Sequence, residues 1–350
     1  MTGLSALSVA PMMDITDRHF RSFIRTISRH TLLYTEMVTE QAVRHGQRER
    51  LLGFSAAEQP LALQLGGSDA AGLAAATRIG WEQGYREVNL NVGCPSDRVQ
   101  SGEFGACLML RPRHVAELVS AMRDASPLPV TVKHRIGVDH SDSFSELLDF
   151  VDTVASAGVT RFTVHARKAW LQGLSPKENR EIPPLRYDLV MKLASLRPEL
   201  EFELNGGVRS LDQAAELLAV GPVKAVMIGR AVAENPWLLG RADSLMFGAA
   251  DPADSPAAAV RAWLPYVEQQ LQLGVPFRVL MRPLLGLFRG QRGGRLWRRG
   301  EDDRLNLIHL ATPRLSLGLP AAAAANPARR RCSAWHCPAA WHWYPGRRRT

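Results

Sequence analysis

Short apolar segments recur along the first 230 residues, and amphipathic segments separate them. Eight are predicted to be buried strands because they are apolar on both faces or rich in β-branched residues: Leu7–Ala10, Leu32–Thr35, Leu61–Leu65, Glu87–Val92, Val130–Lys133, Arg161–His165, Glu201–Leu204 and Ala225–Ile228. The intervening segments with helical periodicity include Ala70–Gln83, Arg113–Asp124, Ser143–Ala157 and Leu211–Ala219. Eight βα units in about 245 residues match a TIM barrel, and their even spacing favours a closed barrel over a doubly wound sheet.

The pattern changes after the eighth unit. Two helices are expected, Ala257–Leu273 and Phe277–Phe288, the second kinked at Pro283. From Gly300 onward no helical or strand period remains, and alanine and arginine runs dominate. We therefore predict a barrel over 1–248, a small helical domain over 249–299 and a disordered, basic, low-complexity tail over 300–350. Out-of-frame translation is the alternative interpretation of the tail.

Composition narrows the classes of function. The 350 residues contain no apolar run long enough for a membrane span and no N-terminal leader pattern, which predicts a cytoplasmic protein. The net charge of +9 is uneven: Arg278–Thr350 holds 15 basic and 3 acidic residues, a net +12, and the rest of the chain carries −3. This asymmetry favours a polyanionic partner, nucleic acid first, over a merely solvated tail.

A barrel places its functional residues at the carboxyl ends of its strands. Polar, reactive or glycine residues stand at these positions: Pro11-Met12-Met13, Glu36, Gln64, Asn91, Cys94, Lys133, Arg135, His165, Asn205-Gly206-Gly207 and Gly229-Arg230. Such clustering predicts a reactive site at the mouth of the barrel.

Three side chains are candidates for chemistry at this mouth. Cys94 lies on a tight Gly93-Cys94-Pro95 turn, where an exposed thiol is favoured over a packed one, whereas Cys107 is interpreted as packing. Lys133 and His165 end neighbouring strands, and a buried lysine calls for an anion or an electron-rich ring. Their alternatives are a snorkelling lysine and a hydrogen-bonded core histidine. No metal site is predicted, because the residues lack metal-ligand spacing.

The last two loops have the character of a phosphate site. Asn205-Gly206-Gly207 and Gly229-Arg230 follow the seventh and eighth strands, where barrels bind phosphate through backbone N–H groups. With a lysine, a glutamine and a thiol at the same mouth, the set fits a flavin mononucleotide (FMN) site.

The motifs together resemble one family. They are Ser8-Val9-Ala10-Pro11-Met12, Tyr34-Thr35-Glu36-Met37, Leu63-Gln64-Leu65, Asn89-Leu90-Asn91-Val92-Gly93-Cys94-Pro95-Ser96, Val132-Lys133, Val164-His165-Ala166-Arg167, Asn205-Gly206-Gly207 and Gly229-Arg230. Over Leu4–Arg299 the chain resembles the tRNA-dihydrouridine synthases. The stretches Ser175–Leu185, Leu287–Gly290 and Gly294–Arg299 resemble the A-type subfamily, which modifies positions 20 and 20a of the tRNA D-loop.

The resemblance implies a flavin enzyme that reduces the C5=C6 bond of uridine in tRNA. Hydride would pass from reduced FMN to C6, Cys94 would protonate C5, and NADPH or NADH would reduce the flavin again. The resemblance assigns FMN to Pro11, Met12, Met13, Gln64, Lys133, His165, Asn205, Gly206, Gly207, Gly229 and Arg230. It assigns tRNA to Asn91, Arg98, Lys177, Arg180, Arg295 and Arg298, and implies no obligate protein partner.

Two departures and two rival functions accompany this interpretation. Residues from Gly300 onward do not follow the family pattern, and Pro283 falls where the family helix is uninterrupted. Both departures lie in the segment that the resemblance assigns to tRNA docking, and neither lies in the barrel. The rivals are a flavin barrel that reduces a small enone or dihydropyrimidine-type metabolite and a non-catalytic tRNA binder. The basic segments argue against the first, and Cys94, Lys133 and His165 argue against the second.

Overall fold

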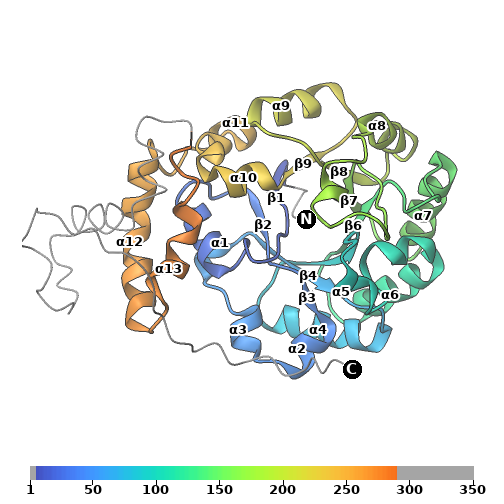
Figure 1. Cartoon of the computed structure of the whole chain (residues 1–350), viewed down its shortest axis with the longest axis horizontal. Helices are drawn as coiled ribbons and strands as arrows, with labels where there is room; N and C mark the ends of the chain where they lie inside the picture. Colours follow the sequence, from blue (N-terminus) through green and yellow to red (C-terminus); the bar gives the residue numbers. More distant parts are fainter. Residues whose placement is uncertain (1–4, 290–350) are drawn as a thin grey trace, which may run out of the picture. The chain divides into compact units, whose positions relative to one another are not determined.

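Eight parallel strands close into a barrel, as the sequence predicts. The computed structural model describes residues 5–289. The barrel strands are β1 (Leu7–Val9), β2 (Leu32–Tyr34), β4 (Leu61–Gly66), β5 (Glu87–Val92), β6 (Val130–Arg135), β7 (Arg161–His165), β8 (Glu201–Asn205) and β9 (Ala225–Ile228). Each pairs in parallel with its neighbours, and the β2–β4 pairing closes the ring (Figure 1). A two-residue strand that the sequence analysis missed, β3 (Val38–Thr39), extends the pairing of β4.

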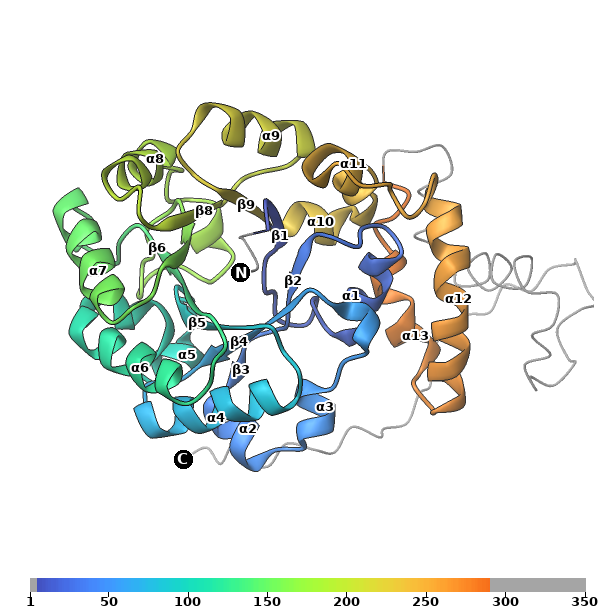
Figure 2. The same cartoon turned by 180° about the vertical axis from the view of Figure 1, so that it is seen from behind.

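Helices surround the barrel, as both views show (Figures 1 and 2). The α-helices up to the end of the barrel are α1 (Arg18–Arg25), α2 (Glu40–His45), α3 (Arg48–Leu52), α4 (Ala70–Glu82), α5 (Asp97–Gln100), α6 (Pro112–Asp124), α7 (Phe144–Ser156), α8 (Tyr187–Leu196), α9 (Leu211–Val220), α10 (Arg230–Glu234) and α11 (Ala242–Phe247). Short 3₁₀ turns include η1 (Ala56–Glu58), η2 (Gly105–Leu110), η3 (Glu178–Arg180) and η4 (Pro236–Leu239). The architecture is a TIM barrel.

The inner face of the barrel is polar over several strands, which corrects the expectation of strands apolar on both faces. Val88, Leu90 and Val92 are fully buried, and they alternate along β5 with Glu87 and Asn89. Because successive side chains of a strand point to opposite faces, the apolar set packs under the helices and the polar set lies inside the barrel. The prediction of strands that are apolar on both faces did not take this alternation into account.

A carboxylate inside the barrel shows how this polar face is held. The two carboxylate oxygens of Glu203, on β8, accept hydrogen bonds from Ser8 of β1 and Thr163 of β7, each at 2.6 Å. Strand β9 lies between β1 and β8 in the sheet, so the Ser8 contact crosses the barrel interior. Both hydroxyls offset the cost of burying the carboxyl group.

The opposite part of the interior is apolar. Five buried residues from β1, β2, β4 and β9 or the loops that follow them form one cluster: Ala10, Leu32, Tyr34, Ala62 and Met227. The interior therefore has one apolar and one polar half; β5–β8 supply most of the polar half, and Ser8 of β1 and Gln64 of β4 complete it.

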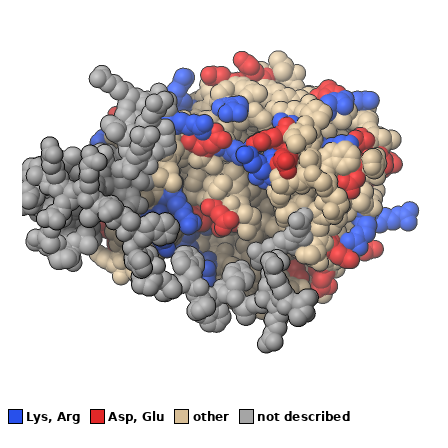
Figure 3. Space-filling model, in the orientation of Figure 1, with Lys and Arg blue, Asp and Glu red and all other residues tan. Residues whose placement is uncertain are grey.

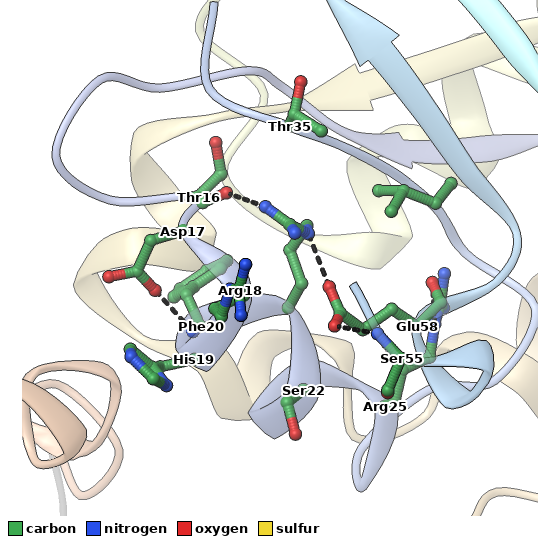
Figure 4. Close-up of polar contacts among 12 residues, drawn as sticks. Thr16, Asp17, Arg18, His19, Phe20, Ser22, Arg25, Thr35, Ser55 and Glu58 are labelled. Carbon is green, nitrogen blue, oxygen red and sulfur yellow. Dashed lines mark hydrogen bonds and ion pairs between the residues drawn. The ribbon is translucent and has the colours of Figure 1, made fainter. Parts of the chain in front are cut away.

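Helix α1 begins at a capping residue and is held to the turn η1 by a buried ion pair. Asp17 caps it by accepting a hydrogen bond of 2.8 Å from the backbone N–H of Phe20 (Figure 4). Nε of Arg21 donates to Oε2 of Glu58, in η1, at 2.8 Å, and both side chains are buried. The backbone N–H of Ser55 donates to the other oxygen of Glu58, so this carboxylate has partners on both sides.

The segment after the barrel is helical and packs on α1. Helix α12 (Pro256–Gln272) places Trp263 against Phe23, with ring centroids 5.1 Å apart. Nε1 of Trp263 donates to the Ser22 hydroxyl at 3.2 Å. The expected helix over 277–288 is wrong: α13 (Phe277–Leu280) is one turn, followed by the 3₁₀ turn η5 (Arg282–Leu284). Pro283 has no N–H to donate, and a proline in a helix interior kinks or ends the helix; here the α-helix ends before it.

Several expectations fall outside the described residues. These are Arg295, Arg298 and the whole tail predicted over 300–350. The boundaries at 248/249 and 299/300 stay predictions. Of the helices that the structure describes between residues 5 and 289, none has the length and apolar character to cross a bilayer.

The contact between α12 and α1 predicts the effect of removing Trp263. Trp263→Ala should lower the free energy of unfolding by about 3–5 kcal/mol, because it empties a fully buried aromatic site. Thermal unfolding followed by circular dichroism measures this. Leu273→Ala is the matched control, since Leu273 is 72% exposed at the end of the same helix. Equal melting temperatures for Trp263→Ala and the wild type would contradict the packing described.

Candidate functional site

A cavity of about 470 Å³ opens where the barrel strands end. Fourteen of the residues that the resemblance assigns to catalysis, FMN or tRNA line it: Pro11, Met12, Met13, Gln64, Asn91, Cys94, Lys133, His165, Arg180, Asn205, Gly206, Gly207, Gly229 and Arg230. Figure 3 shows Lys and Arg side chains beside the hollow of this face. The volume suits a ligand of cofactor size.

Cys94 is held at the cavity by the side chain of Asn91. Oδ1 of Asn91, near the end of β5, accepts hydrogen bonds from the backbone N–H groups of Gly93 at 3.1 Å and Cys94 at 3.0 Å. This turn fixes the loop, because the amide oxygen satisfies both donors at once. The Cys94 thiol is half-buried and lies 3.4 Å from the Ser96 hydroxyl.

Cys107, the other cysteine of the described chain, lies elsewhere. It is half-buried in η2, does not line the cavity, and its Sγ donates to the backbone oxygen of Phe104 at 3.0 Å. Burial raises the pKa of the Cys107 thiol. These contacts fit a packing role.

Arg135 also holds the loop that carries Cys94. Its Nε donates to the Gly93 carbonyl at 2.8 Å, and its Nη1 donates to the carbonyls of Lys168 and Asn179, each at 3.0 Å. Burial lowers the pKa of Arg135 to about 10, so the guanidinium remains charged at neutral pH. One buried cation therefore joins the Cys94 loop to the loop that follows β7.

Lys133 presents a buried amine to the cavity. Among the described residues its Nζ donates to one acceptor, Oδ1 of Asn205, at 3.0 Å, and the Asn205 amide donates in turn to the Met227 carbonyl at 2.9 Å. Burial, and then the charge of Arg135, lower the pKa of Lys133 to about 8. The amine is mostly protonated at pH 7. Burying this positive charge without an anion nearby lowers the stability of the folded chain.

His165 is neutral at physiological pH. Burial lowers its pKa well below the usual value, and the charges of Arg135, Lys133, Arg167 and Arg230 act in the same direction. A neutral imidazole offers one donor and one acceptor to the cavity.

The two glycines after β8 have backbones that other residues rarely adopt. Gly206 and Gly207 have φ angles of +115° and +73°. A Cβ atom on Gly206 would lie 2.7 Å from the His165 ring, and one on Gly207 would lie 2.4 Å from Leu185. Side chains here would displace residues that shape the cavity, so the turn requires glycine.

Arg230 lines the cavity but is already paired. Its Nη1 lies 3.0 Å from Oε1 of Glu181, and its Nη2 donates to the Arg180 carbonyl at 2.9 Å. The resemblance assigns Arg230 to the FMN site. In the structure the guanidinium joins α10 to the loop after β7, and a phosphate would share it with Glu181.

The remaining predicted residues divide into two groups. Met12 is held by its backbone N–H, which donates to the Thr16 hydroxyl at 3.0 Å, whereas Met13 is 52% exposed.

Lys177 is exposed and does not line the cavity, and the side chain of Arg98 lies outside the described part of the molecule. Of the strand-end residues, Glu36 lies beside the site, where it accepts a hydrogen bond of 2.5 Å from Asp14 N–H, but it does not line the cavity.

Sequence reasoning gave no role to several lining residues. Arg135 is the clearest case: it was named among the strand-end residues, but neither the pattern nor the resemblance assigned it a contact, although the period of β6 places it on the same face as Lys133. Met37, which stands in a quoted motif without an assigned role, also lines the cavity, as do Arg209 and Glu234, which no motif indicated. Within residues 5–289, no group of three or more His, Cys, Asp or Glu side chains is placed to hold a metal.

Comparison with known proteins gives a consistent result. The family model described as "Dihydrouridine synthase (Dus)" matches residues 8–309, ten residues beyond the resemblance drawn from the motifs. Proteins named "tRNA-dihydrouridine(20/20a) synthase" are similar over most of their length. That of Synechocystis sp. is 55% identical over 314 residues, 90% of this chain and 93% of the relative. That of Pseudomonas syringae is 54% identical over 85% of this chain and 88% of the relative, and that of Escherichia coli K12 is 52% identical over 83% and 84%.

The buried amine predicts a pH-dependent stability difference. Lys133→Met should raise the unfolding free energy of the ligand-free protein at pH 7 by up to about 3 kcal/mol. The melting temperature should rise accordingly. The folded-state pKa is depressed to about 8, so between pH 8 and about 10.5 the unfolded chain binds more protons than the folded one. The wild type therefore gains stability across this range, and its deficit relative to Lys133→Met shrinks.

Melting temperatures measured from pH 7 to 10 test this prediction. Lys177→Met is the matched control, since Lys177 is exposed. A difference between Lys133→Met and the wild type that stays constant with pH would contradict the prediction.

Proposed function

Because the chain belongs to the dihydrouridine synthase family, we propose that it reduces uridine to 5,6-dihydrouridine in tRNA. The observation that supports this most directly is the Cys94 thiol, held by Asn91 and Arg135 beside a cavity that also contains Lys133. The names of its relatives point to positions 20 and 20a of the D-loop as the target.

The cavity residues fit FMN. Lys133 supplies a buried ammonium group with a single described acceptor, and the left-handed Gly206 and Gly207 keep the backbone accessible where side chains would collide. Gln64, Lys133 and His165 would hold the polar edge of the ring, and Pro11, Met12 and Met13 would line it. Asn205, Gly206, Gly207, Gly229 and Arg230 would hold the phosphate side. Bound FMN would supply the hydride chemistry at C6 of the target uracil, with NADPH or NADH as the reductant.

Cys94 is the proton donor in this proposal. Hydride addition at C6 leaves negative charge at C5, and the Cys94 thiol transfers its proton to C5. The C5–H bond forms as the S–H bond breaks, and the resulting thiolate regains a proton from solvent. Arg135, charged and bonded to the adjacent Gly93 carbonyl, stabilises negative charge at this loop.

The tRNA contacts follow from position and charge. Asn91 and Arg180 line the cavity and would contact the target nucleotide, which must leave its base stack to enter. Lys177 is exposed beyond the rim and suits a phosphate contact. Arg98, Arg295 and Arg298 are assigned to tRNA by the resemblance and the basic C-terminal charge alone.

A direct assay tests the function. The purified full chain is incubated with FMN, NADPH and an unmodified tRNA transcript, and dihydrouridine is mapped by reverse-transcription stops. A stop at position 20 or 20a is expected. Flavin-dependent NADPH oxidation without any stop would reject tRNA as the substrate.

Replacing the thiol separates proton donation from flavin binding. Cys94→Ala should retain bound flavin and NADPH oxidation and lose about 10²- to 10⁴-fold in the rate of dihydrouridine formation, because the proton donor is absent. Rapid-quench measurement of dihydrouridine gives this rate. Cys107→Ala is the control and should form product at the wild-type rate. Wild-type product formation by Cys94→Ala would remove Cys94 from the mechanism.

A further inference from the structure

Glu87 lies at the start of β5, on the inner face of the barrel, and receives three donors. The Tyr34 hydroxyl lies 3.0 Å and the Thr131 hydroxyl 2.7 Å from its Oε1, and Nη1 of Arg161 lies 3.2 Å from its Oε2. Burial, and then the charges of Glu87 and Glu203, raise the pKa of Tyr34 well above its usual value, so this hydroxyl keeps its proton. All three groups that face Glu87 thus donate, and its carboxylate oxygens accept.

A chain of side-chain hydrogen bonds leads from Thr131 towards the cavity. Nδ2 of Asn89 donates to the Thr131 hydroxyl at 2.9 Å, and Nε2 of Gln64 donates to Oδ1 of Asn89 at 2.8 Å. Nδ2 of Asn91 then donates to Oε1 of Gln64 at 2.9 Å. The first three of these side chains are almost fully buried, at 2% exposure or less.

Both ends of the chain impose the same direction. At the mouth, Oδ1 of Asn91 faces two backbone N–H donors, from Gly93 and Cys94, so its amide can only be oriented one way. At the other end Glu87 admits only donors. Reversing the amide of Gln64 would place N–H against N–H and oxygen against oxygen, with two buried hydrogen bonds lost.

The chain spans much of the barrel along one strand. Glu87, Asn89 and Asn91 alternate along β5 and share its inner face. Four residues of extended strand separate Glu87 from Asn91, on the order of 13 Å. A carboxylate deep in the barrel is thus connected to the loop at the mouth.

We propose that Glu87 and Thr131 are positioning residues for Cys94. Through Asn89, Gln64 and Asn91 they fix the orientation of the amide groups and the turn that presents the thiol. The effect of this positioning on the reaction rests on the function proposed above. The hydrogen bonds and the support of the loop do not depend on that function. Glu203 provides a contrast: its described side-chain partners are Ser8 and Thr163, which continue no chain to the Cys94 loop.

Thr131 is the link to break, because one hydroxyl both donates to Glu87 and accepts from Asn89. Thr131→Val keeps the shape and removes both bonds. In the flavin-free full chain, the backbone amides of residues 91–96 should exchange hydrogen about five- to tenfold faster, as expected for one buried hydrogen bond lost from the support of the loop. Mass spectrometry of the peptide that contains Cys94 measures this rate.

Two variants serve as controls for exchange. Thr131→Ser restores a hydroxyl and should return the rate to within about twofold of the wild type. Thr163→Val removes the equivalent hydroxyl beside Glu203 and should leave the loop unchanged. Should Thr131→Val fail to fold, Thr131→Cys, a weaker hydrogen-bonding group of similar size, should give a smaller increase. Wild-type exchange in a folded Thr131 variant, or an equal increase in Thr163→Val, would overturn the proposal.

Dihydrouridine formation provides the second measurement. The single-turnover rate should fall in Thr131→Val and recover in Thr131→Ser, with the KM for tRNA unchanged. Faster exchange with an unaltered rate would refute the positioning role. If the wild-type protein forms no dihydrouridine, the proposed function fails, and the exchange measurement alone still decides whether the chain supports the loop.

Discussion

Polar and charged groups inside the barrel must all find partners, and the site depends on this constraint. TIM barrels usually fill their interior with branched apolar side chains. Here Glu87 and Glu203 occupy interior positions, and each is surrounded by donors from other strands. Removing one partner would leave a buried group without compensation, which is costly in a low dielectric. The hydrogen bonds therefore fix the side chains of the polar half, and through them the orientation of the residues at the mouth.

The mouth itself carries an excess of positive charge. Lys133 and Arg135 have lowered pKa values because they are buried, and the positive charges of neighbouring groups contribute to each shift. His165 is kept neutral by the same causes. Such repulsion lowers the stability of the chain alone, and an anionic ligand in the cavity would relieve it. The site thus resembles many binding sites in which stability is given up for affinity.

Much of this arrangement could be predicted from the sequence. The spacing of apolar segments predicts eight strands and their closure, and the residues after each strand predict the lining of the cavity. What could not be predicted are the pairings between distant positions. Ser8 and Glu203 are 195 residues apart, and nothing local to either indicates their contact. The pairing of Arg230 with Glu181 similarly depends on how the loop after β7 folds back. Pro283 did carry a local sign, but a proline in a helical segment is compatible with either a kink or a helix end, and the structure shows the end.

The polar half of the barrel and the reactive loop share a single strand. The period of β5 places Glu87, Asn89 and Asn91 on the inner face, and the strand ends two residues before Cys94. A shift of one residue in its pairing would move all three polar side chains under the helices and their apolar neighbours into the barrel. The large cost of that exchange fixes the register. The position of the thiol is consequently determined by the same alternation that decides which side chains fill the barrel, so the fold and the site are specified together.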